Sequence, residues 1–219
     1  MDIDHLLRQL KEIEPTHLAD VDKSIRVMDA GLRPVRLGLK LIGRAFTLEA
    51  REDFLTVMVA LAEAKPGDVL VVDTRGSSRA VLGELFSLEA ARRGLAGIIV
   101  DGPIRDVITI RGLDIPVYAR HYTPLAGTTQ KLYPIQQPVI CGGVIVNPGD
   151  IVFGDDDGVI VVSEAELVRL LPTALEIAGR EREAISRMQA GTSLLTMLNF
   201  EEHHANLRAG RGGALKFVL

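Results

Sequence analysis

Cysteine, tryptophan and long apolar runs are the features that this chain of 219 residues has least of. It contains one cysteine and no tryptophan. The single Cys141 excludes an internal disulfide and a cysteine-based zinc site, and a small buried hydrophobe is its expected role. No apolar run reaches the roughly 20 residues of a membrane-spanning helix, and residues 1–14 resemble a charged amphipathic helix rather than a secretory leader. We therefore expect a cytoplasmic protein.

An excess of positive charge is also missing. The formal net charge is -4, so a general surface for nucleic acid or for anionic lipid is not expected. Hydrophobic residues make up 47% and charged residues 25%, which is typical of a globular protein. The length is sufficient to bury a sizeable core.

Alternating strand and helix patterns predict an α/β domain. Strands are expected at residues 40–49, 69–73, 97–100 and 115–119, and helices at 4–13, 16–21, 53–64 and 81–93. Two β-rich segments follow at 138–146 and 151–162, the second with a hairpin turn at 155–158, and then a long helix over 164–190 that contains Pro172. Thr16 is the expected N-cap of its helix, Gly43 a close-approach position within its strand, and Ser163 the cap of the long helix.

The chain shows no internal repeat and no segment with the composition of a linker. We therefore predict one domain over residues 1–197. The remaining residues, 198–219, are polar and rich in glycine and are expected to form a C-terminal tail.

The segment from Gly83 to Asp106, GELFSLEAARRGLAGIIVDGPIRD, is the most informative in the chain. A helix pattern leads into an apolar strand, a short turn is expected at residues 101–104, and Arg105 and Asp106 follow at once. Arginine binds carboxylates through two parallel hydrogen bonds, and aspartate binds hard cations. Glu84 lies at the start of the helix, with twenty residues between it and Arg105. The segment is therefore the first candidate for a functional site.

Several residues also have structural interpretations. Arg105 and Asp106 could form a surface ion pair, and Glu84 could complement the helix dipole. Asp101 could cap a turn or contact metal or substrate. The loop 74–78 could line the substrate pocket or lie outside it. The acidic run 155–157 is expected to be a solvated hairpin, because it lacks the downstream glutamate of a calcium loop.

The order of motifs resembles the RraA-like family. The motifs are GDVLVVD (67–73), the segment 83–106, IPVYAR (115–120), NPGDIVFGDDDGVIVV (147–162) and a final helix of mixed charge. That family includes the 4-hydroxy-4-methyl-2-oxoglutarate/4-carboxy-4-hydroxy-2-oxoadipate aldolases and the regulator of ribonuclease E activity. Over residues 15–190, the resemblance implies an αββα sandwich of the swivelling β/β/α type. It also implies a trimer or a dimer of trimers, with a divalent-metal site near the subunit interface.

The resemblance also assigns site residues. The aldolases of the family have an acid, twenty residues and then Arg-Asp, and this chain has Glu84, Arg105 and Asp106, with glutamate where aspartate is frequent. The regulators are associated with glycine at the acid position and an acid three residues after the aspartate, where this chain has Thr109. The chain therefore resembles the aldolases more than the alternative, a non-catalytic regulator that binds a ribonuclease.

The implied reaction is retro-aldol cleavage of 4-hydroxy-4-methyl-2-oxoglutarate-type substrates to pyruvate by a class II lyase. Decarboxylation of oxaloacetate passes through the same pyruvate enolate and is the expected side activity. Mg²⁺ or Mn²⁺ would act as Lewis acid, with Asp106 as its ligand. No lysine in an apolar context lies near the motif, which disfavours a Schiff-base aldolase, and a single glycine after residues 69–73 gives no support to a methyltransferase.

The remaining roles follow from this reaction. Arg105 would bind the substrate carboxylate or carbonyl and stabilise the enolate. The start of the helix, at Gly83, Glu84, Leu85 and Phe86, would bind a carboxylate through backbone N–H groups. Glu84 would orient or deprotonate a metal-bound water.

Overall fold

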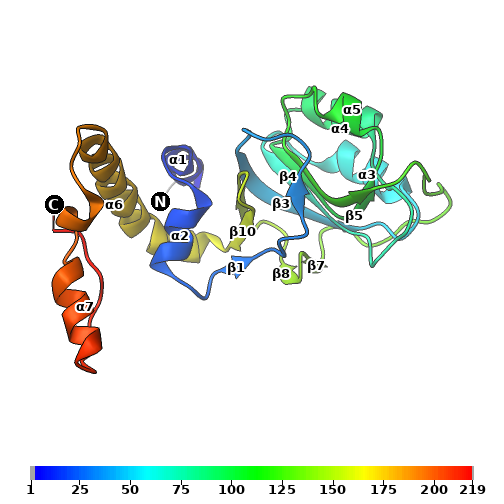
Figure 1. The fold of residues 1–219 in the computed structure, drawn as a ribbon. Coiled ribbons are helices and arrows are strands. Elements are labelled where there is room, and N and C mark those ends of the chain that lie inside the picture. Colours follow the sequence, from blue (N-terminus) through cyan, green and yellow to red (C-terminus); the bar gives the residue numbers. More distant parts are fainter. Residues whose placement is uncertain (1–2, 219) are drawn as a thin grey trace. The chain divides into compact units, whose positions relative to one another are not determined.

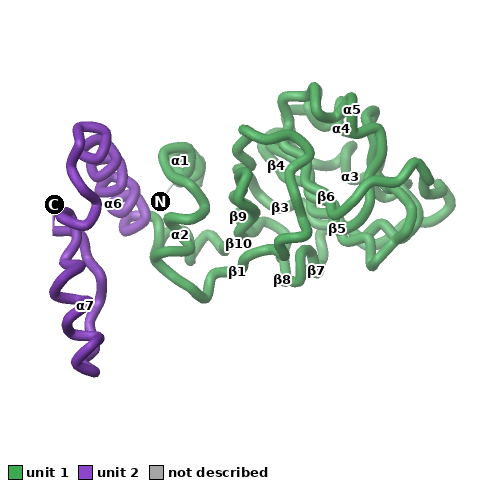
Figure 2. Tube along the Cα trace, viewed as in Figure 1, with its two compact units in different colours: residues 1–171 green, residues 172–219 purple. Residues whose placement is uncertain are grey.

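The structure, a computed structural model, describes residues 3–218 and divides into two compact units (Figure 2). Unit 1 comprises residues 1–171 and unit 2 residues 172–219; the boundary falls at Pro172, inside helix α6 (Glu164–Gln189). Unit 2 holds the rest of α6, a short 3₁₀ helix (Leu194–Met197) and α7 (Phe200–Arg208), so the polar tail contains a helix. The division into a domain of residues 1–197 and a tail stays a prediction. None of the helices within residues 3–218 is long and apolar enough to cross a membrane.

Unit 1 is built on an eight-stranded mixed sheet with the order β1-β10-β9-β3-β4-β5-β6-β2. Its strands are β1 (Arg26–Val27), β2 (Arg33–Pro34), β3 (Leu41–Glu49), β4 (Asp68–Asp73), β5 (Gly97–Ile104), β6 (Val117–Tyr122), β9 (Ile151–Gly154) and β10 (Val159–Val162). Strands β3 to β6 are parallel, and the flanking strands pair antiparallel. The carboxyl ends of β3 to β6 therefore share one edge of the sheet.

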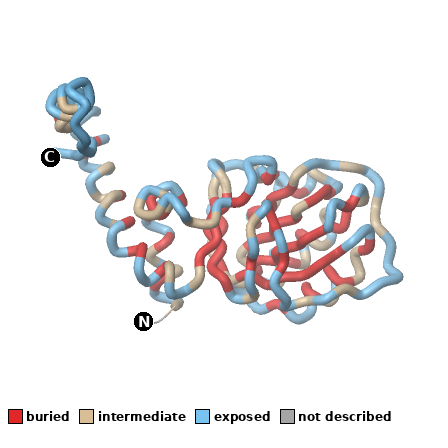
Figure 3. The backbone as a smooth tube through the Cα atoms, turned by 90° about the horizontal axis from the view of Figure 1, so that it is seen from below, coloured by how far each residue is buried: buried red, intermediate tan, exposed pale blue. Residues whose placement is uncertain are grey.

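The two faces of the sheet are covered differently. Helices α3 (Leu55–Glu63), α4 (Glu84–Arg92) and α5 (Val107–Ile110) lie on one face (Figure 1). The opposite face is covered by the hairpin of β7 (Val139–Cys141) and β8 (Val144–Val146). Side chains of β4 alternate between the two cores, since Leu70 and Val72 pack under the helices while Val69 and Val71 pack under the hairpin. Figure 3 shows these strands as largely buried.

This layering of helices, sheet and hairpin confirms the predicted α/β class. Cys141 is fully buried in the hairpin core, as expected. The remaining helices of unit 1 are α1 (Ile3–Gln9), a 3₁₀ turn (Leu10–Glu12) and α2 (Pro15–Val21). The hairpin turn at residues 155–158 is also confirmed, because it joins the antiparallel pair β9 and β10. The cap at Ser163 is confirmed as well, because the Glu166 N–H donates to Ser163 Oγ at 3.2 Å.

Two predicted helix starts were wrong. Helix α2 begins at Pro15 with Glu14 as N-cap, not at Thr16, because proline is tolerated at the first helical position, where its missing N–H costs no hydrogen bond. Helix α4 begins at Glu84, three residues later than expected. The apolar residues before it continue the helical pattern in the sequence, but Ala80 forms a bridge to Ala126 instead.

The predicted turn at residues 101–104 was also wrong, because β5 continues to Ile104. The register of β5 with β6 shifts between Val100 and Pro103, which marks a β-bulge. Proline is accepted at bulges, since a bulged residue need not donate to the ladder. A Cβ at Gly102 would overlap the side chain of Thr74, the residue that follows β4, so the backbone of Gly102 packs directly against Thr74. Arg105 and Asp106 therefore follow a strand, not a turn.

The close approach at Gly43 is confirmed, and it yields a stability prediction. A Cβ at this position would overlap the Gly67 carbonyl oxygen and lie 2.9 Å from Val69 Cγ2. We expect Gly43→Ala to lower the free energy of unfolding by about 1–3 kcal/mol in urea denaturation, because backbone must move to admit the methyl group. Gly179→Ala is the matched control: a Cβ there meets no atom within 4 Å, so no loss is expected, and an equal loss in both variants would contradict the assignment.

Candidate active site

The start of α4 and the residues after β5 meet at Gly83. A Cβ on Gly83 would overlap Asp106 Oδ2 and lie 3.1 Å from Arg105 Cγ. Gly83 itself has extended backbone dihedrals, which any residue adopts, so the need for glycine here is one of space. The structure thus brings the two ends of the 83–106 segment into direct contact, with α4 and α5 adjacent on the same side of the sheet (Figure 1).

Asp106 directs its carboxylate at the start of α4. Its backbone is left-handed (φ 57°, ψ 36°), an uncommon conformation that aspartate accepts better than most residues. The side chain does not cap α5, the helix that it precedes. Its Oδ2 instead accepts the Glu84 N–H at 3.3 Å and lies 3.3 Å from Arg105 Nε. The carboxylate is 36% exposed and is favoured by the positive end of the α4 dipole.

Arg105 is held by its backbone while its side chain stays accessible. Its N–H donates to the Leu82 carbonyl at 3.0 Å, and its side chain is 43% exposed. Within the described residues, its two terminal guanidinium nitrogens donate no hydrogen bond, and its closest approach to Asp106 is through Nε. They therefore remain available for two parallel bonds to a carboxylate.

Both residues border a recess of about 320 Å³, a volume that includes the part of its mouth that is open to solvent. The residues lining it are Phe54, Ala80, Val81, Leu82, Gly83, Leu85, Phe86, Arg105, Asp106 and Ala126. Five of the six predicted site residues are among them; the exception is Glu84, whose backbone N–H contacts Asp106 while its half-buried side chain lies outside the lining.

Five lining residues were not predicted as site residues, and all of them are apolar: Phe54, Ala80, Val81, Leu82 and Ala126. Phe54 packs edge-on against Phe86 with ring centroids 5.5 Å apart. Ala80 and Ala126 are joined by a β-bridge, in which Ala80 N–H donates to the Leu125 carbonyl at 2.8 Å. No local pattern distinguishes such residues from ordinary core. The loop at 74–78 is not part of the lining.

Asp101 belongs to a separate polar network at the edge of the sheet. Its carboxylate pairs with Arg120 and accepts the Gly142 N–H at 2.7 Å, while Thr74 Oγ1 donates to its carbonyl at 2.6 Å. It therefore lies within β5, binds the turn of the β7–β8 hairpin at Gly142, and does not line the recess. These contacts tie the β7–β8 hairpin to β5 and β4.

Glu49 and Asp73 continue the same row across the paired ends of β3 and β4. Glu49 accepts hydrogen bonds from Arg75 at 2.7 Å and from Arg51 at 2.6 Å. The bond from Arg75, together with that from Arg51, holds the pKa of the Glu49 carboxyl below its usual value. Because the carboxylates of Glu49, Asp73 and Asp101 are paired, we assign a structural role to this row.

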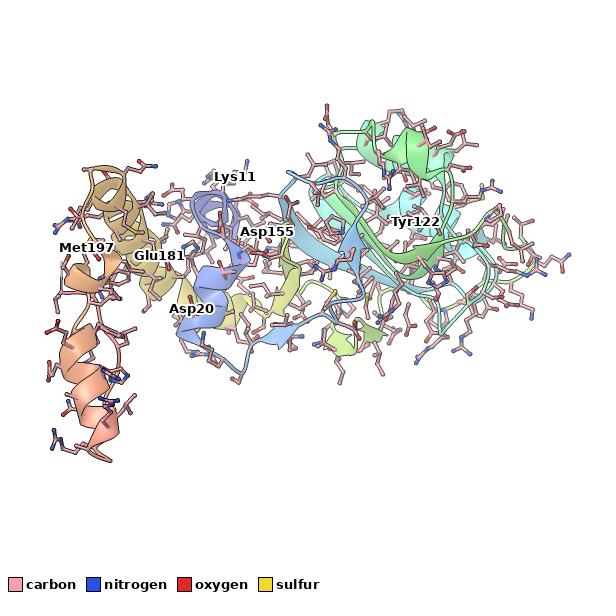
Figure 4. All side chains as sticks on the ribbon, in the orientation of Figure 1. Lys11, Asp20, Tyr122, Asp155, Glu181 and Met197 are labelled. Atoms are coloured by element: carbon pink, nitrogen blue, oxygen red, sulfur yellow. The ribbon has the colours of Figure 1, made fainter. Side chains whose placement is uncertain are left out.

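A divalent cation in this chain has to rely on few protein ligands. Residues 3–218 contain no group of three or more histidine, cysteine, aspartate or glutamate side chains suited to a metal ion. The acidic turn at 155–157, whose Asp155 is labelled in Figure 4, is therefore not such a group. Asp106 suits Mg²⁺ or Mn²⁺ without a closed cage of protein ligands, because Mg²⁺ keeps several waters and needs only one or two carboxylates.

Comparison with known proteins places this fold in a family. Residues 14–161 match the RraA-like model, described as Aldolase/RraA. A Halalkalibacterium halodurans protein, provisionally named 4-hydroxy-4-methyl-2-oxoglutarate aldolase, is 34% identical over 170 residues, which cover 77% of this chain and 81% of that protein.

Two solved structures show the same fold under different names. One, from Streptomyces coelicolor, is called an unusual member of the RNase ES inhibitor RraA protein family; it is 34% identical, with a TM-score of 0.72, and the match covers 84% of this chain and 96% of that one. The other is called an S-adenosylmethionine: 2-dimethylmenaquinone methyltransferase, from Geobacillus kaustophilus; it is 33% identical, with a TM-score of 0.65, over 69% and 95% of the two chains. These relatives share a fold while their names differ in activity, and the chain belongs to the RraA-like family.

Proposed function

We propose that this chain is a divalent-metal-dependent carbon–carbon lyase that cleaves 4-hydroxy-4-methyl-2-oxoglutarate-type substrates to pyruvate and decarboxylates oxaloacetate as a side reaction. The observation that carries the proposal is the juxtaposition of the Arg105 guanidinium and the Asp106 carboxylate in the lining of one recess. Both charges adjoin the start of α4 and remain partly exposed.

In this proposal, Arg105 binds the carboxylate of the 2-oxo acid through its terminal nitrogens. The C4 hydroxyl loses its proton through a water molecule to Glu84, the C3–C4 bond breaks as C4 becomes a carbonyl, and the electron pair of that bond forms the pyruvate enolate over C2 and C3. Arg105 and the N–H groups at the start of α4 stabilise this developing negative charge. Return of a proton to C3 by the same route then gives pyruvate. Mg²⁺ or Mn²⁺, with Asp106 as its protein ligand, supplies Lewis acidity.

Glu84 has a part in proton transfer, which a single variant tests. At the first position of α4, its carboxylate can exchange a proton with substrate through a water molecule. We expect Glu84→Gln to lower kcat by about 10²-fold or more while the Mg²⁺ affinity, measured by calorimetry, changes little. Unchanged turnover together with a large loss of Mg²⁺ affinity would make Glu84 a metal ligand instead.

The proposed function is tested by pyruvate release from 4-hydroxy-4-methyl-2-oxoglutarate and from oxaloacetate, each with Mg²⁺ and with EDTA. EDTA-sensitive cleavage of the hydroxy acid supports an aldolase. Turnover of oxaloacetate alone supports a decarboxylase with another natural substrate. Absence of both activities in the presence of metal contradicts the proposal.

The second candidate function is regulation of a ribonuclease by direct binding. It is favoured by the 34% identity to the Streptomyces coelicolor protein. Tight binding to a purified ribonuclease, with inhibition and without any metal-dependent turnover, would support it. The predicted trimer or dimer of trimers is tested in the same preparation by light scattering.

A further inference from the structure

The recess beside Arg105 has an apolar lining apart from two residues. Of the residues that line it, only Arg105 and Asp106 carry charge. Its walls include the edge-on pair of Phe54 and Phe86 and the side chain of Leu85. In the proposed function, Arg105 and the N–H groups at the start of α4 already serve the reacting 2-oxo acid, so a second carboxylate in this space would lose its water without gaining a partner, which is costly.

Within residues 3–218, no second cation lines the recess. Arg79 comes close, since its guanidinium donates to the carbonyl of the lining residue Ala126 at 3.3 Å, but Arg79 is not among the lining residues. Among the described residues, Arg105 is therefore the only cation that borders the recess. In the proposed function it already holds the carboxylate next to the 2-oxo group.

We propose that the recess receives the C4 substituent of the substrate and selects an alkyl group over a carboxymethyl group. This inference rests on the proposed lyase function. Because its lining is apolar apart from Arg105 and Asp106, the recess suits a methyl group or a short alkyl chain better than a second carboxylate. The chain is thereby directed to 4-alkyl-4-hydroxy-2-oxo acids, with 4-hydroxy-4-methyl-2-oxoglutarate preferred over 4-carboxy-4-hydroxy-2-oxoadipate.

The first test compares kcat/KM for these two substrates, which differ at C4 only by methyl against carboxymethyl. We expect the methyl substrate to be preferred by at least about tenfold. Equal values, or a preference for the carboxymethyl substrate, would overturn the inference while leaving the lyase function intact.

Leu85→Arg is the corresponding variant. The Leu85 side chain is 69% exposed at the recess, so a guanidinium can be placed there without being buried. We expect the preference to shift by at least about tenfold toward the carboxymethyl substrate. Leu88→Arg is the matched control, on the same helix, 43% exposed and outside the lining, and its ratio should not change. An unchanged ratio in Leu85→Arg counts against the inference.

A binding measurement separates this inference from the lyase function. The probes are 2-oxohexanoate and 2-oxoadipate, unreactive six-carbon chains that end in a methyl group and a carboxylate, titrated into the protein by calorimetry with Mg²⁺. Tighter binding of 2-oxohexanoate supports the apolar recess even if no substrate is turned over, which would defeat only the lyase proposal. Equal affinities, tighter binding of 2-oxoadipate or no binding of either probe overturns the inference.

Discussion

Replacing Asp106 by asparagine is expected to abolish EDTA-sensitive pyruvate release, with a fall in kcat of at least about 100-fold. Asparagine accepts the left-handed backbone that this position has, and its side-chain oxygen still accepts the Glu84 N–H. The variant therefore removes the charge while the fold stays intact. The measurement is initial rate over a range of Mg²⁺ concentrations, with circular dichroism to verify folding.

The matched comparison uses the neighbouring cations. Arg105→Ala should lose a similar factor, because removal of one donor from developing negative charge costs roughly 10²–10³ in kcat. Arg111→Ala, an exposed arginine at the end of α5, should keep full activity. Retention of full activity in Asp106→Asn would remove the metal assignment, whatever the other two variants do.

Gly83→Ala is the second change with a large expected effect, although it adds only one methyl group. The new Cβ would overlap Asp106 Oδ2, so the carboxylate has to move away from the start of α4. We expect kcat/KM to fall by about 10²-fold, since displacements of about 1 Å at a reacting centre have effects of this size. Because the backbone of Gly83 is extended, no dihedral strain accompanies the change.

Stability separates this steric effect from unfolding. Gly83→Ala should change the free energy of unfolding by only about 1 kcal/mol, the usual cost of a less favourable N-cap. Thermal melts of Gly83→Ala and of the control Gly179→Ala measure this directly. A loss of activity in proportion to a loss of folded protein would refute the steric explanation.

The central strands were predicted well from the sequence, because continuous apolar runs of this length are stable only when both of their faces are buried. Residues 69–73 and 97–100 are continuous apolar segments, typical of parallel strands buried on both faces, and both lie in the middle of the sheet. The errors fall where tertiary contacts override local signals. Gly102 and Pro103 indicate a turn in isolation, but the pairing of Pro103 and Ile104 with β6 keeps this segment within β5.

The candidate site was predictable only as far as it is local in the sequence. Glu84, Arg105 and Asp106 were predicted from one contiguous segment, although the helix start and the strand end beside them differ from the predicted ones. The recess beside them depends on Phe54, Ala80 and Ala126, which reach it through a ring contact and a β-bridge. Apolar residues in such positions have no local sequence signature, because their identity is determined by packing and not by the chemistry of the site.

The bulge in β5 also determines how the length of this chain can vary. Strand β5 already contains one β-bulge, between Val100 and Pro103, and Gly102 lies directly against Thr74. Because side chains alternate along a strand, one residue inserted or deleted between 101 and 104 would turn Arg105 toward the opposite face. The segment 123–138 has no strand or helix, but the bridge of Ala126 to Ala80 fixes its path beside the recess. Among natural relatives, length variation should therefore be rare between residues 101 and 104.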